Sequence, residues 1–119
     1  MKGKIKVLVL SPDKAPEVRE IKDDMDQIRS IVGGYVEAHY WTIGGYENNG
    51  GWDTAILCDE DGKLKGKPFC IAIGPHVFVG TIILASRKGA ILESLEEKKI
   101  TRWTAEWHEQ HKKETNDND

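Results

Sequence analysis

Cysteine is scarce in this chain of 119 residues, and long apolar runs are missing. The two cysteines, Cys58 and Cys70, lie in apolar, strand-like segments and form no C-x-x-C pair. We therefore expect reduced, buried thiols and no disulfide scaffold. No run reaches the roughly eighteen apolar residues of a membrane-spanning helix, and the first apolar run is too short and too strand-like for a secretory signal. These absences predict a cytoplasmic protein without a membrane partner.

An excess of positive charge is also missing. The chain has 17 lysines and arginines against 20 aspartates and glutamates, which gives a formal net charge of -3. A weakly acidic chain is not drawn to a phosphate backbone, so we expect no stable nucleic-acid binding. Local basic clusters occur at residues 2–6, at residues 63–67 and at Arg87 with Lys88. Each is typical of a solvated strand edge or turn.

Metal-binding signatures are incomplete. His108 and His111 lie in the tetrapeptide HEQH, which lacks the four-residue spacing of the zinc protease signature. The acidic residues 59–61 lack the spaced oxygens and the closing glutamate of a calcium loop. A solvated hairpin turn is the better interpretation of residues 59–63. We expect no metal site.

Signatures of catalysis and of nucleotide cofactors are missing too. Phosphate-binding glycines lie between the end of a strand and the start of a helix. Neither glycine pair, at residues 33–34 or at residues 44–45, lies in such a place. No serine or cysteine lies in a nucleophile elbow. His39 is best interpreted as a partly buried histidine with a hydrogen-bond partner. We therefore expect no catalytic residue and no cofactor.

What the first part of the chain does contain is a consistent set of local signals. Residues 4–10 alternate so that a strand begins half exposed and ends buried, as a central strand does. After a proline-containing turn, residues 17–21 alternate like a hairpin partner with one solvated face. Asp23 or Asp24 can cap a helix that Gly33 would end in the left-handed conformation.

Further strands are predicted after this helix. Residues 35–43 and 52–58 have strand patterns, and the second is followed by the turn at residues 59–63 and a return strand from Leu64. The segment VFVGTIILA, residues 77–85, is apolar on both faces. We expect it to run as one strand through the centre of the sheet.

The last structured element is predicted to be a helix. Ser94 and Glu97 have the spacing of a capping box. Ile100, Trp103 and Trp107 form an apolar stripe at helical spacing, so the two tryptophans are interpreted as core residues.

Together these patterns predict a single α+β domain over residues 1–113. Its sheet is mostly antiparallel, with five to six strands, one short internal helix and a C-terminal helix packed on one face. Residues 114–119 are polar and acidic and are predicted to be a disordered tail.

Aromatic side chains border the glycine-rich stretch 44–51, which itself carries two asparagines. Aromatic faces stack on bases or anchor partner proteins, and amides recognise polar edges. We therefore predict that a ligand or partner binds here, with basic side chains supplying charge if the ligand carries phosphates. The predicted residues are Trp41, Tyr46, Asn48, Asn49, Trp52, Arg87, Lys88 and Arg102.

Four segments carry a resemblance to a known family: KVLVLSPDKAPEVREI, DQIRSIVGGYVEA, TAILCDEDGKLKGKP and GPHVFVGTIILA. In this order they resemble a family of small proteins of unknown function carried by phages, plasmids and other mobile elements, the domain of unknown function numbered 3846. The resemblance covers roughly residues 4–85. It implies no established enzyme activity, and it implies the gene neighbourhood of phage accessory factors that act on the host.

The expected function is therefore that of a non-enzymatic phage-type accessory protein that inhibits host antiviral immunity in the cytoplasm of a bacterial host. It would sequester a nucleotide-derived signalling molecule, or it would bind and block a host defence protein, and we expect a homo-oligomer. Two alternatives are a small metal-dependent nucleotide hydrolase, and a DNA mimic or regulatory accessory protein.

Overall fold

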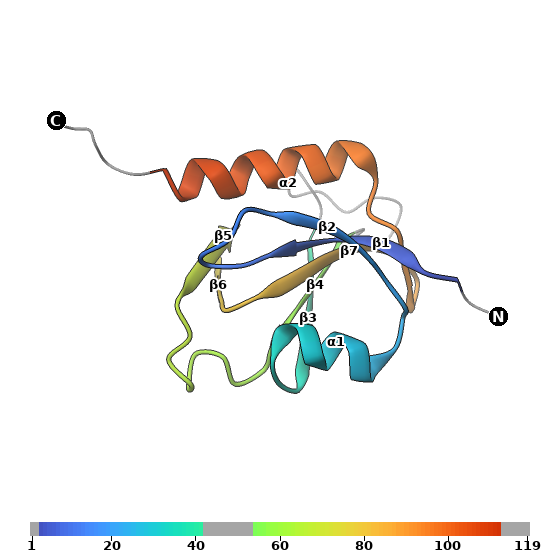
Figure 1. Ribbon diagram of the computed structural model, residues 1–119, viewed down its shortest axis with the longest axis horizontal. Coiled ribbons are helices and arrows are strands. Elements are labelled where there is room, and N and C mark those ends of the chain that lie inside the picture. The colour runs from blue at the N-terminus through green and yellow to red at the C-terminus, as the bar shows by residue number, and fades with distance from the viewer. Residues whose placement is uncertain (1–2, 42–53, 113–119) are drawn as a thin grey trace, which may run out of the picture.

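The computed structural model describes residues 3–41 and 54–112 (Figure 1). The predicted tail at residues 114–119 lies outside this range. The elements follow in the order β1 (Ile5–Leu10), β2 (Glu17–Ile21), α1 (Met25–Val32), β3 (Val36–Trp41), β4 (Thr54–Asp59), β5 (Phe69–Ile73), β6 (His76–Val79), β7 (Ile82–Lys88), β8 (Ile91–Glu93) and α2 (Glu97–Gln110).

Most of the strands form one antiparallel sheet. Five strands run in the order β2-β1-β7-β4-β3, and β8 adds a sixth by pairing with β7. Strand β1 lies between β2 and β7, and its last four residues are buried, as predicted for a central strand. The predicted α+β class with a mostly antiparallel sheet is confirmed.

The two helices cover opposite faces of this sheet, with α2 above it and α1 below it in Figure 1. Alternate residues of β1 point to the two sides, since side chains alternate along a strand. Val7 and Val9 pack in one buried cluster with Ile28 of α1. Leu8 packs in the other cluster with Trp107 of α2. The helix α2 therefore packs on one face, as predicted, and α1 closes the other.

The sequence predicted an aspartate cap at the start of α1 and a left-handed Gly33 at its end, and both are confirmed. The Asp24 side chain caps the helix by accepting a hydrogen bond from the Asp26 N–H at 2.9 Å. Gly33 ends it in the left-handed conformation with φ 85°, and its N–H donates to the Arg29 carbonyl at 2.7 Å. Glycine adopts this conformation without the steric cost that a Cβ imposes.

The predicted single strand at residues 77–85 is wrong. The chain turns at Gly80, which has φ 74°, so β6 leaves the main sheet and only β7 runs through it. Strand β6 pairs instead with β5 in a separate two-stranded sheet. The predicted return strand from Leu64 is also wrong, because β4 pairs with β3 and β7 and the chain between β4 and β5 forms turns.

The predicted capping box of α2 is wrong as well. Ser94 Oγ accepts a hydrogen bond from the Lys6 N–H at 2.9 Å, and the N-cap of α2 is Glu96, whose side chain makes no capping bond. The core assignment of Trp103 and Trp107 is confirmed, since they are 7% and 8% exposed. Neither described helix is long and apolar enough to cross a membrane.

Candidate functional site

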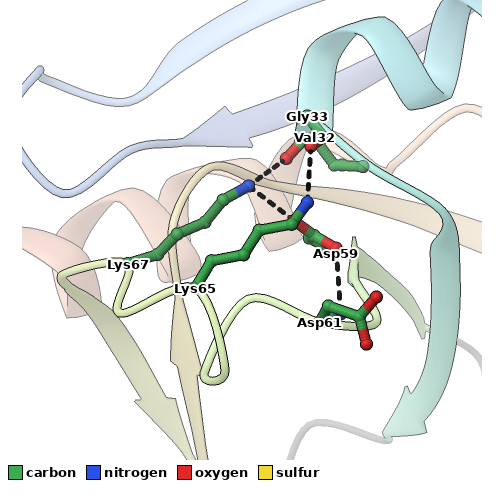
Figure 2. Close-up of polar contacts among 6 residues, drawn as sticks. All are labelled: Val32, Gly33, Asp59, Asp61, Lys65 and Lys67. Atoms are coloured by element: carbon green, nitrogen blue, oxygen red, sulfur yellow. Dashed lines mark hydrogen bonds and ion pairs between the residues drawn. The ribbon is translucent and has the colours of Figure 1, made fainter.

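A buried aspartate at the end of β4 organises one end of the molecule (Figure 2). The Asp59 side chain is 1% exposed and lies 2.8 Å from Lys65 Nζ and 2.7 Å from Lys67 Nζ. Its Oδ1 also accepts a hydrogen bond from the Asp61 N–H at 2.9 Å. The ammonium groups of Lys65 and Lys67 hold the pKa of Asp59 well below its usual range. The prediction of a solvated turn is therefore wrong for Asp59.

The same two lysines reach the C-terminal end of α1, as Figure 2 shows. Lys67 Nζ donates to the Val32 carbonyl at 3.0 Å, and Lys65 Nζ donates to the Gly33 carbonyl at 3.2 Å. The last carbonyls of a helix have no partner inside it and carry partial negative charge, so cations bind there favourably. We call Asp59, Lys65 and Lys67 the Asp59 cluster. It ties the turns after β4 to α1. Lys65 is exposed in a turn, as the sequence predicted, and Lys67 is only partly exposed; the sequence did not predict the ion pairs that both make with Asp59.

Two glycines leave the space that the side chains of the Asp59 cluster occupy. A Cβ on Gly34 would lie 2.5 Å from Asp59 Oδ1, and a Cβ on Gly80 would lie 2.7 Å from Lys67 Cδ. No side chain fits at either place without displacing the cluster. The segments IVGG and DEDGKLKGKP, distant in sequence, therefore meet at this point.

A second group of polar side chains lines a cavity of about 200 Å³ beside Asp59. Glu37 and His39 come from β3, and Cys58 of β4 lies directly opposite Glu37 in the register. His39 Nε2 lies 3.5 Å from Glu37 Oε2, and one ligand atom from each of the three residues lies within 4.8 Å of the others. Burial, followed by the nearby carboxylates Glu37 and Asp59, raises the pKa of the Cys58 thiol to about 11. We call this space the Cys58 cavity.

Sequence reasoning did not find this grouping. It interpreted His39 as partly buried with a partner, which fits its half-buried position next to Glu37, and it treated Cys58 only as a buried thiol, which is confirmed. The available signal was Glu37-x-His39 on one face of a strand with a cysteine on a neighbouring strand. That signal needs the β3–β4 register, which the sequence alone did not provide.

A third feature is an aromatic–guanidinium pair at the far end of the sheet from the Asp59 cluster. The Arg87 guanidinium lies over the Tyr40 ring, 4.3 Å from its centroid, and Tyr40 is 44% exposed. Arg87 also donates a hydrogen bond to the Gly89 carbonyl at 2.8 Å. These residues and Leu92 border a shallow depression of about 280 Å³.

The residues predicted for ligand binding are only partly brought together. Arg87 and Lys88 end β7, and Trp41 ends β3. Trp41 pairs with Thr54, which pairs in turn with Ser86, so the strands that flank residues 42–53 end beside Arg87. The remaining predicted residues from this stretch, Tyr46, Asn48, Asn49 and Trp52, lie outside the described residues.

Arg102 lies apart from this group. It is exposed on α2, which packs on the face that Leu8 and Leu84 present. Arg87 follows Ala85 on the opposite face, the one that α1 covers. Arg87 and Arg102 therefore do not contribute to one site.

Comparison with known proteins identifies a family for this chain. No curated protein and no solved structure matches the chain. The model of the family described as a domain of unknown function, DUF3846, matches residues 5–108, a range that includes the Asp59 cluster, the Cys58 cavity and most of α2. Because the match spans most of the chain, this protein belongs to the DUF3846 family.

Proposed function

We propose that this protein binds and sequesters a nucleotide-derived signalling molecule without converting it, as a phage-type accessory protein that inhibits host antiviral immunity in the bacterial cytoplasm. The observation that carries the proposal is the stacking of Arg87 on the exposed Tyr40 ring, 4.3 Å from its centroid. The pair borders a shallow depression at the strand ends that flank residues 42–53.

The chemistry of this pair suits a nucleotide. A guanidinium presents five N–H donors in a planar fork, enough to keep its contacts within the protein and still bind a phosphate. Bases stack on guanidinium planes as well as on aromatic rings, and stacking on a ring is typically worth about 1–3 kcal/mol per base. A base can therefore extend the Tyr40–Arg87 stack. Lys88, the next residue on β7, is exposed and adds positive charge at the end of the strand, on the face opposite to Arg87 because side chains alternate along a strand. The backbone of Trp41, another predicted binding residue, ends the strand that carries Tyr40.

The test is a binding titration with a panel of cyclic dinucleotides and cyclic ADP-ribose. We expect one of them to bind with a saturable isotherm, and we expect Tyr40→Ala and Arg87→Ala each to weaken binding by about tenfold or more, the equivalent of ~1.4 kcal/mol. The chain offers a matched control in the other guanidinium–tyrosine pair, Arg29 over Tyr35 at 5.3 Å. Arg29→Ala should leave binding unchanged.

A second measurement separates storage from catalysis. The protein is saturated with the bound compound, heated, and the supernatant is analysed by mass spectrometry. Intact compound in stoichiometric amount is expected. Turnover at many equivalents per protein would support the hydrolase alternative, and the absence of binding to every compound, together with capture of a host defence protein, would replace this proposal by the blocking mode.

We also propose that the protein is a homo-oligomer. Strand β3 is an outer strand of the main sheet, and it carries the exposed side chain of Tyr40. Outer strands and exposed aromatic side chains are common places for association. Native mass spectrometry of the full chain should give a multiple of the monomer mass, and a monomer at all concentrations would contradict this.

A further inference from the structure

We propose that Glu37, His39 and Cys58 form a binding site for a divalent metal ion of the zinc class. The proposal does not depend on the nucleotide site. The three side chains lie on the face of the sheet that carries the second sheet and α2, whereas Tyr40 follows Ala38 on the α1 face.

The first argument is geometric. Two ligand atoms bound to one tetrahedral zinc ion at about 2.1 Å each are about 3.4 Å apart. His39 Nε2 and Glu37 Oε2 lie 3.5 Å apart, which already fits this separation. The cysteine sulfur belongs to the same group, in which all three ligand atoms lie within 4.8 Å of one another. Side-chain adjustments of about 1 Å are enough to complete a three-ligand set.

The scaffold holds these ligands in place. Glu37 and Cys58 are directly opposed in the β3–β4 register, and His39 follows Glu37 on the same face of β3. The His39 ring packs edge-on against Phe78, with the centroids 5.2 Å apart. Ligands on paired strands are positioned more rigidly than ligands on loops, which lowers the entropy cost of binding an ion.

The chemistry of the donors identifies the class of ion. One imidazole nitrogen, one thiolate sulfur and one carboxylate oxygen are a mixed set that suits zinc and cobalt, whereas calcium and magnesium prefer oxygen ligands only. The ion replaces the proton of the Cys58 thiol, which is released to solvent. Three protein ligands would leave a position open on a tetrahedral ion. His76 also lines the Cys58 cavity, and its ring lies 5.6 Å from the His39 ring.

The ligand side chains are accessible to a cation from solvent. Glu37 and His39 are partly exposed, with side chains 50% and 33% exposed, so an ion can enter from solvent. Glu37 and Glu60 add negative charge at the cavity wall, and Lys63 is a single positive charge there. The Asp59 carboxylate next to Cys58 is already paired with Lys65 and Lys67, so it does not compete for the ion.

The experiment titrates the full-length protein with Zn²⁺ by calorimetry and, separately, with Co²⁺ under reducing conditions. We expect one ion per chain, and an intense near-ultraviolet band from sulfur-to-cobalt charge transfer, which reports that Cys58 is a ligand. Cys58→Ala should abolish the band. The matched control is Cys70→Ala, because Cys70 is the other buried, free cysteine and does not line the cavity.

Two further variants keep the test decisive if the cysteine variant does not fold. Glu37→Gln and His39→Gln change partly exposed side chains, and each should weaken Zn²⁺ binding by about 100-fold or more, since even residues that only support a metal ligand contribute 10- to 100-fold. His108→Gln, on the exposed side of α2, should leave binding unchanged. Circular dichroism checks that each variant is folded.

The outcomes divide clearly. Saturable binding that depends on all three residues supports the site. The proposal is overturned if the folded wild-type chain binds neither ion, if the cobalt band persists in Cys58→Ala, or if Glu37→Gln and His39→Gln bind Zn²⁺ as the wild type does. None of these results bears on nucleotide binding by Tyr40 and Arg87, so the two proposals can fail separately.

Discussion

At the scale of single residues, Asp59 is the side chain on which the connection between β4 and β5 depends. Its carboxylate is almost completely removed from water, which is costly for a charge unless it is paired and hydrogen-bonded. Two ammonium groups and one backbone N–H supply those partners. The cluster needs a residue without a side chain at position 34, because a Cβ there would lie 2.5 Å from the carboxylate.

This close approach predicts an energetic coupling between Gly34 and Asp59. Gly34→Ala should destabilise the protein by about 1–3 kcal/mol, as overpacking does. In an Asp59→Ala background the added methyl group has room, so the cost of Gly34→Ala should fall by about 1 kcal/mol or more. Urea unfolding of the four proteins measures the double-mutant cycle.

A matched glycine gives the control for this cycle. Gly89 has φ 62°, and a Cβ there would meet nothing within 4 Å. Gly89→Ala should cost about 1–2 kcal/mol from backbone strain alone, equally in both backgrounds. A Gly34→Ala cost that is likewise the same in both backgrounds would show that Gly34 does not lie against Asp59.

At the scale of elements, α2 is attached to the main sheet through two tryptophans that differ in their contacts. The Trp107 Nε1–H donates to the Ser11 carbonyl at 2.9 Å, and the Trp107 ring stacks on His111 at 4.0 Å. Trp103 Nε1 is buried and has no hydrogen-bond partner among the described residues. The two residues are almost equally buried, so the hydrogen bond and the His111 stack distinguish them.

This difference predicts unequal effects of the same substitution. Trp107→Phe removes the donor and leaves the Ser11 carbonyl without it, at a cost of about 1–3 kcal/mol for a buried unsatisfied group, besides the cost of the smaller ring. Trp103→Phe has the same cost of a smaller ring, but it removes an N–H donor that has no hydrogen-bond partner among the described residues. Thermal unfolding followed by circular dichroism should give a lower Tm for Trp107→Phe, and equal Tm values would contradict the assigned role of the hydrogen bond.

At the scale of the whole molecule, the small β5–β6 sheet depends on its contacts with α2. A two-stranded sheet is marginal by itself in water. The Gln110 side chain makes two hydrogen bonds to the Ala72 backbone, accepting from its N–H at 2.7 Å and donating to its carbonyl at 2.9 Å. His111 also contacts the Cys70 carbonyl. The end of α2 thus continues the hydrogen bonding of β5.

We therefore expect Gln110→Ala to loosen the small sheet selectively. Amide hydrogens of β5 and β6 should exchange about tenfold faster, because losing these two bonds costs roughly 1.4 kcal/mol or more of local stability. Amides of β1 and β7 should exchange at nearly the wild-type rate. Glu109→Ala, at an exposed position next to Gln110, is the control. Uniformly faster exchange throughout the main sheet would mean that the two sheets unfold as one unit.

The candidate sites could be predicted only in part. Arg87 was predicted as a binding residue from its charge, but its partner Tyr40 was not, because their contact crosses β4 in the sheet. Glu37 and Cys58 were missed for the same reason, since they meet only through the β3–β4 register. The ion pairs of Lys65 and Lys67 were missed because nothing in their neighbourhood in sequence shows that Asp59 is buried.

The amino-acid sequence by itself determined the features that depend on near neighbours: the half-exposed start and buried end of β1, an aspartate cap at residue 23 or 24 and the Gly33 end of α1, the apolar stripe of α2 and the α+β class. Only the tertiary structure decided where the chain leaves the main sheet at Gly80, which polar side chains share the Cys58 cavity, and that Asp59 is enclosed by two lysines. The physical reason is the distance along the chain over which each kind of interaction acts. Periodicity, caps and turns act over a few residues, whereas the burial and pairing of a charge depend on segments that meet only when the sheet has formed.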